Sequence, residues 1–209
     1  TKWKINNLGK GWVLGETLIT GIGQGYTQIT PIQLCLMTAQ IANGGYKIKP
    51  KILTDDNQLT SEQVKKAMKD NNLYNSHIPL FNDQKNIKII QEAMFSSTNE
   101  LRGTSYKSRI DDPKYQFAGK TGTAQVKRIS KRERELDLKI FQIPYEERDH
   151  ALYIAFGPYK NPRYALSIIV EHGGSGSSAA APMATKLFKL IVDQHQYRKK
   201  LPDYKEFNI

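Results

Sequence analysis

The sequence contains one cysteine and no long apolar run, and both absences limit the class of protein. Cys35 alone excludes an intramolecular disulfide framework and any zinc cluster built from cysteines. Even the longest apolar stretch, 151–156, is far shorter than the ~18–20 residues of a membrane-spanning helix. No signal peptide or internal repeat is visible, and the first residue is Thr1. We therefore expect a piece of a longer protein.

The composition is that of an ordinary soluble globular protein with a basic surface. Hydrophobic residues make up 39% and charged residues 24% of the 209 positions, which excludes a wholly disordered chain, a collagen-like repeat and a polytopic membrane protein. The formal net charge of +11 favours polyanionic surroundings, such as nucleic acid or an anionic cell envelope. No nucleic-acid-binding motif accompanies the basic clusters at 127–134 and 198–200, so we interpret them as solvated surface. The histidines lack metal-site spacing and are expected at the surface or in packing: His77, His150, His172 and His195.

The first third of the sequence predicts a loop followed by a well-delimited helix. Residues 1–29 are rich in glycine and polar residues, and 21–26 lack both the third glycine and the preceding strand of a dinucleotide-binding loop. Thr30 is a candidate N-cap, Pro31 takes the first helical position, and a Gly-Gly pair at 44–45 ends the apolar helical stripe. Because Cys35 lies on that stripe, we expect a buried thiol.

The rest of the sequence predicts an antiparallel sheet flanked by helices, an α+β fold. The pattern indicates a short strand at 46–53, a polar surface excursion at 54–84 with a short helix near 61–69, and a helix at 85–96. A strand at 117–126 and a charged loop or short helix at 127–149 follow. The last predicted elements are a β-hairpin of 151–156 and 164–170, a flexible turn at 172–178 and a final helix at 179–198.

A Gly-Lys-Thr-Gly-Thr-Ala run at 119–124 is the sharpest chemical signal. It is not a phosphate-binding P-loop, because the first glycine of that motif would fall on Lys114. The run resembles the Lys-Thr-Gly strand of penicillin-binding proteins and class A β-lactamases. The segments 21–26 and 30–34 resemble the G-x-G-Q-G and T-P-x-Q-L motifs of class B penicillin-binding proteins. Residues 143–165 and 171–182 resemble the hairpin and last-helix regions of the penicillin-binding protein 2 type, so the resemblance covers nearly the whole chain in order.

This resemblance implies a partial penicillin-binding-protein transpeptidase (β-lactamase-like) fold and a peptidoglycan D,D-transpeptidase. In that family a serine attacks the D-Ala-D-Ala bond, and the acyl-enzyme passes to a neighbouring stem peptide, which crosslinks the cell wall. Lys120 would act in catalysis and substrate binding. Thr121, Gly122 and Thr123 would bind substrate, and the Thr123 N–H would face the oxyanion.

The resemblance also implies partners and a location. Peptidoglycan stem peptides and β-lactam antibiotics would bind, a SEDS-family glycosyltransferase would be the partner, and no nucleic acid, metal or organic cofactor is expected. The parent protein would lie on the periplasmic face of the inner membrane and shape the cell wall there. Its single membrane anchor would precede these residues.

The Ser-x-x-Lys nucleophile motif of the family is absent from the sequence. None of the serines has a lysine three residues later. Ser97-Thr98-Asn99 fits the family's Ser-x-Asn motif by letters but lies at a helix end, later in the order than the family places it, so we interpret it as a coincidence. We expect residues 1–209 to be one truncated domain, the C-terminal part of a transpeptidase domain, inactive alone and with one exposed sheet edge. A non-catalytic peptidoglycan-binding or sensory module and a basic nucleic-acid-binding protein remain alternatives.

Overall fold

The computed structural model describes residues 2–50, 79–127, 135–136 and 138–199, and the contacts of the chain divide it into two units, 1–30 and 31–209. Among the described helices, none combines the length and the hydropathy needed to cross a membrane. The helix expected near 61–69 lies outside the described residues.

The first unit consists of two short helices, so the loop predicted for 1–29 is wrong. Helix α1 spans Lys2–Leu8 and helix α2 spans Leu14–Gly21. The buried Lys4 side chain forms an ion pair with Glu16 and donates to the Gly11 carbonyl at 2.7 Å. Glu16 also accepts from the Val13 N–H at 2.9 Å, which caps α2. These local bonds stabilise helical turns that the glycine-rich composition had concealed.

The described residues of the second unit form three strands and three long helices, and most of the elements predicted there are confirmed. Helix α3 begins at the predicted Pro31, and the second helix and both arms of the hairpin fall where the sequence places them. The bounds of the main elements are α3 Pro31–Ala42, α5 Gln84–Asn99, β1 Ala118–Ala124, β2 His150–Gly157, β3 Tyr164–Val170 and α7 Ala181–Lys199.

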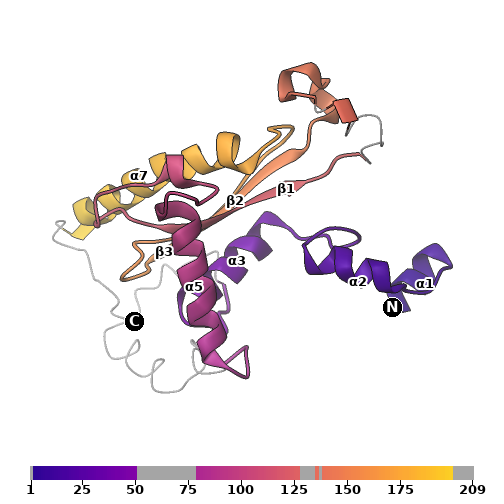
Figure 1. Ribbon diagram of the computed structural model, residues 1–209. Helices are drawn as coiled ribbons and strands as arrows, with labels where there is room; N and C mark the ends of the chain where they lie inside the picture. Colours follow the sequence, from indigo (N-terminus) through magenta and orange to yellow (C-terminus); the bar gives the residue numbers. More distant parts are fainter. Residues whose placement is uncertain (1, 51–78, 128–134, 137, 200–209) are drawn as a thin grey trace, which may run out of the picture. The chain divides into compact units, whose positions relative to one another are not determined.

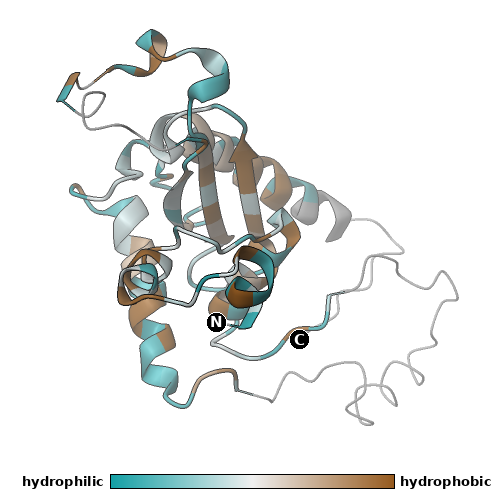
Figure 2. Ribbon diagram, turned by 90° about the vertical axis from the view of Figure 1, so that its right-hand side faces the viewer, coloured by the Kyte–Doolittle hydropathy of each residue, from teal (hydrophilic) through white to brown (hydrophobic). Residues whose placement is uncertain are grey.

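The three strands form one antiparallel sheet in the order β1-β2-β3, with helices on both faces (Figure 1). Met94 of α5 packs with Phe156 and Ala118 on one face, where α3 also contributes Ile41. Helix α7 covers the other face. There Phe188 is fully buried and stacks on Phe117 at 4.8 Å between ring centroids. Figure 2 shows the hydrophobic colour on β2 and β3 between these layers, whereas β1 is paler or hydrophilic. The predicted α+β architecture is therefore confirmed.

Two further expectations need correction. Within the described part of the predicted strand 46–53, only Tyr46 forms a bridge, to Pro79. The Ile48 N–H instead donates to the Gln40 side chain at 3.1 Å, so a helix side chain satisfies a group that a neighbouring strand would otherwise take. The predicted flexible turn 172–178 runs into a π-helix, η4 (Gly176–Ala180), which leads directly into α7.

The charged segment 127–149 forms short 3-10 helices in its described part. These are η2 (Ile140–Gln142) and η3 (Tyr145–Glu147). A loop with short helical turns is what the mixed charges predict for this segment. Cys35 is half-buried rather than buried, and its thiol donates to the Ala165 carbonyl of β3 at 3.4 Å.

Candidate active-site strand

Strand β1 carries the Lys-Thr-Gly run on an edge of the sheet. Within the described residues β1 pairs only with β2, in a register that sets Lys120 opposite Ile154 and Gly122 opposite Leu152. Burial falls along the strand, because Ala118 and Gly119 are buried whereas Lys120 and Thr123 are exposed. The second half of β1 is therefore the accessible half.

Gly119 is a glycine because a tyrosine passes across it. A Cβ at this position would lie 2.3 Å from the Tyr153 hydroxyl and 2.5 Å from the ring carbon that carries it. Tyr153 is fully buried, and burial raises the pKa of its phenol above the ordinary value. Its hydroxyl is held 2.9 Å from Thr98 Oγ1 and donates to Ser105 Oγ at 3.0 Å. A buried hydroxyl that is satisfied twice fixes the ring beneath the strand.

The end of α5 attaches to the first half of the β1 edge. Asn99 Nδ2 donates to the Phe117 carbonyl at 2.9 Å, and Thr98 Oγ1 approaches the Gly119 carbonyl at 3.4 Å. Backbone groups of alternate residues point to the same edge of an antiparallel strand, so those of Thr121 and Thr123 face this edge too. The structure thus places Ser97-Thr98-Asn99 in the last turn of α5, as the sequence predicted, and attaches it to β1.

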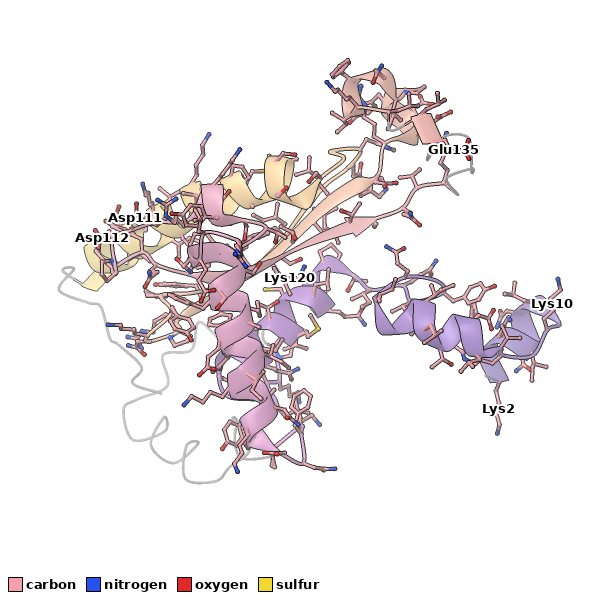
Figure 3. The ribbon with its side chains drawn as sticks, in the orientation of Figure 1. Lys2, Lys10, Asp111, Asp112, Lys120 and Glu135 are labelled. Carbon is pink, nitrogen blue, oxygen red and sulfur yellow. The ribbon has the colours of Figure 1, made fainter. Side chains whose placement is uncertain are left out.

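Lys120 and Thr121 lie beside a row of hydroxyl groups. Lys120 has the same pleat parity as Ala118, so its side chain leaves the sheet on the face of α3 and α5 (Figure 3). Its Nζ donates to the Thr121 carbonyl at 2.9 Å and to Thr121 Oγ1 at 3.5 Å. Thr121 Oγ1 lies 3.2 Å from Thr104 Oγ1, which lies 3.2 Å from Ser97 Oγ.

Gly122 leaves room for close approach on the side of the strand where its Cβ would lie. A Cβ there would meet only Leu152 Cβ, at 3.3 Å. Gly176 of η4 lies against the same point, since its own Cβ would fall 2.6 Å from the Gly122 carbonyl. The start of η4 therefore packs on the strand next to the accessible half of β1. In the described part of the chain, no group of three or more His, Cys, Asp or Glu residues could hold a metal ion.

The sequence motif predicts residues 120–123 as site residues but gives no indication of the residues that hold their strand in place. Thr98, Ser105 and Tyr153 carry no motif of their own, so no local pattern singles them out. Thr104 follows Gly103, and a glycine just after a predicted helix is a sequence signal for a tight turn of the chain. A Cβ at Gly103 would lie 2.3 Å from the Ser97 carbonyl oxygen.

Comparison with known proteins decides the family. The family description "Penicillin binding protein transpeptidase domain" matches residues 3–189. The chain belongs to the penicillin-binding protein transpeptidase family. The resemblance drawn from its motifs is therefore confirmed, as is the partial transpeptidase fold.

Several relatives within this family are of the penicillin-binding protein 2 type. The chain is 31% identical over 210 residues to the peptidoglycan D,D-transpeptidase MrdA of Haemophilus influenzae, covering 100% of the chain and 30% of that relative. It is similar to the crystal structure of Pseudomonas aeruginosa PBP2 in complex with WCK 5153, with a TM-score of 0.66, 34% identity and coverage of 93% and 36% of the two chains. For PBP2 of Helicobacter pylori in complex with MreC, the TM-score is 0.62, the identity 29% and the coverage 95% and 30%. The chain thus spans about a third of the length of these relatives.

Proposed function

We propose that these residues form the C-terminal part of the transpeptidase domain of a longer peptidoglycan D,D-transpeptidase, and that β1 is its substrate-binding strand. The observation that carries this proposal is an edge strand whose accessible half contains Lys120-Thr121-Gly122-Thr123. An extended peptide can add to such an edge by main-chain hydrogen bonds. Membership of the family and its PBP2-type relatives support the reaction class.

In this proposal each residue of the run has a chemical task. Lys120 places a cation beside the proton-transfer network of the serine and beside the carboxylate of the terminal D-Ala. The hydroxyls of Thr121 and Thr123 bind that carboxylate. Gly122 lets the peptide backbone lie against the strand, and the Thr123 N–H stabilises the oxyanion that forms during acylation.

The nucleophile is proposed to lie outside the 209 residues. The sequence has no Ser-x-x-Lys, so the attacking serine and its lysine would come from another part of the longer protein. That serine would form an acyl-enzyme at D-Ala-D-Ala and release D-Ala. The acyl group would then pass to an amine of a neighbouring stem peptide, and β-lactams would acylate the same serine. The chain alone is expected to be inactive.

Partners and location follow from the same proposal. Stem peptides of peptidoglycan are the substrates, β-lactams are inhibitors, and a SEDS-family glycosyltransferase is the partner. The H. pylori PBP2 complex makes an MreC-type protein a second candidate partner. We place the longer protein on the periplasmic face of the inner membrane, with its anchor outside these residues.

Labelling with a fluorescent penicillin tests the proposal. We expect the full-length protein to be labelled covalently and the chain 1–209 to remain unlabelled. Lys120→Ala in the full-length protein should slow acylation by about a hundredfold or more, as expected for a group in the proton-transfer network, without a change in Tm. The control is Lys189→Ala, which removes the same charge from an exposed position on α7. A full-length protein that takes no label would instead support a non-catalytic peptidoglycan-binding module.

A further inference from the structure

The row of hydroxyls beside Lys120 reaches from α5 to β1. Its members are Ser97, Thr104 and Thr121, each 3.2 Å from the next between oxygen atoms. Lys120 closes the row, with its Nζ 3.5 Å from Thr121 Oγ1. Neither Ser97 nor Thr104 belongs to the Lys-Thr-Gly run, so any role for them is additional to the proposed function.

The loop that carries Thr104 is held rigidly against α5. The Ser105 N–H and the Ser105 hydroxyl both donate to the Ser97 carbonyl, each at 3.0 Å. Gly103 lies so close to the same helix turn that a side chain could not fit there. Ser105 is also bonded to the buried Tyr153 hydroxyl. Thr104 is exposed, but its backbone therefore has little freedom to move away from Thr121.

Either oxygen of each hydroxyl pair in this row can be the donor, and hydrogen-bond accounting shows what one of the two directions would do. A hydroxyl has one hydrogen to donate and two lone pairs that accept, whereas a lysine ammonium only donates. Lys120 donates to Thr121 Oγ1, which uses one lone pair. If Ser97 donates to Thr104 and Thr104 donates to Thr121, the second lone pair is used as well. The Thr121 hydrogen then points away from both and is available only to an acceptor arriving from outside.

We propose that Ser97 and Thr104 are positioning residues that set the Thr121 hydroxyl as a hydrogen-bond donor toward a carboxylate-bearing ligand. The inference rests on the proposed function and adds two residues to it. Without Thr104, the Thr121 hydroxyl can rotate and donate its hydrogen to another acceptor. Binding of a carboxylate would then first require that hydroxyl to be reoriented.

The test compares acylation of the full-length protein by benzylpenicillin and by its methyl ester, followed by intact-protein mass. Thr104→Val keeps the shape of the side chain and removes the hydroxyl. We expect it to lower the acylation rate with the free acid about fivefold, which corresponds to ~1 kcal/mol, a typical net hydrogen bond. The rate with the ester should stay unchanged, because the ester has no carboxylate. Thr104→Ser should restore the rate, and Ser97→Ala should give a smaller loss in the same direction.

The controls separate positioning from general loss of structure. Thr185→Val removes a hydroxyl that donates to the Ser108 carbonyl, away from β1, and should leave the acid-to-ester ratio unchanged. In a Thr121→Val background, Thr104→Val should have no further effect. The inference is overturned if Thr104→Val slows both probes equally, or slows neither. If neither probe acylates the unsubstituted protein, the proposed function is overturned and this inference with it.

Discussion

Replacement of Gly119 by alanine is the most direct test of how β1 is held. The added methyl group would lie 2.3 Å from the Tyr153 hydroxyl oxygen, 2.5 Å from the ring carbon that carries it and 2.8 Å from a second ring carbon. Ordinary contacts begin near 3.4 Å, so the ring must move by about 1 Å. Tyr153 is fully buried, and its ring lies edge-on to Phe117. A shift of that size breaks its bonds to Thr98 and Ser105.

The size of the effect follows from these contacts. Forcing a methyl group into a packed site costs about 1–3 kcal/mol, and each lost hydrogen bond of a buried hydroxyl adds ~1 kcal/mol. We therefore expect Gly119→Ala to lower the free energy of unfolding by about 3–5 kcal/mol. At roughly 2–4 °C per kcal/mol for a domain of this size, Tm should fall by roughly 6–20 °C.

The assay is thermal unfolding of the full-length protein, with Gly122→Ala as the matched control on the same strand. At Gly122 the new methyl group meets only Leu152 Cβ at 3.3 Å, so its Tm should change little. Tyr153→Ala should remove most of the penalty of Gly119→Ala, because the methyl group then has space. A Tm for Gly119→Ala within ~1 °C of the parent value would refute the reasoning, as would full additivity in the double variant.

Three further predictions follow from other contacts. The Tyr115 hydroxyl and Lys114 lower the pKa of Asp193 below its ordinary value of 3.8, so Asp193→Asn should destabilise the protein at pH 7. The difference in the free energy of unfolding between the two proteins should shrink as pH falls through that lowered pKa. Urea titrations from pH 3 to 7 that show a constant difference would contradict this. Burial raises the pKa of Cys35, so its thiol should react with a disulfide reagent at pH 8 more slowly in folded than in unfolded protein, and equal rates would disprove it. Gly176→Ala would place a methyl group 2.4 Å from the Leu152 carbonyl, and we expect a larger fall in Tm by scanning calorimetry than for Gly122→Ala; an equal fall would rule out tight packing of η4 on the sheet.

Local signals were enough to predict the elements around the candidate site. Pro31 and the Gly-Gly pair at 44–45 delimit α3, and the spacing of apolar residues places α5. The two apolar runs on either side of the turn at 158–162 predict the hairpin. In each case the residues that decide the element lie within a few positions of it. Local signals failed at α1 and α2, where a lysine and a glutamate twelve residues apart stabilise turns in a glycine-rich segment. They failed also just after Tyr46. There the Gln40 side chain of α3 accepts the Ile48 N–H, which a neighbouring strand would otherwise bind.

The sequence by itself determined the Lys-Thr-Gly strand, the family and the absence of a nucleophile motif, because each of these is written in consecutive or regularly spaced residues. Only the tertiary structure decided which half of β1 is accessible and what holds it. Thr98 and Thr104 meet the strand across separations of 21 and 17 residues, and Thr98 meets Tyr153 across 55. Such contacts depend on how the sheet and α5 pack together, and a hydroxyl carries no sequence signal of the partner that it will meet there.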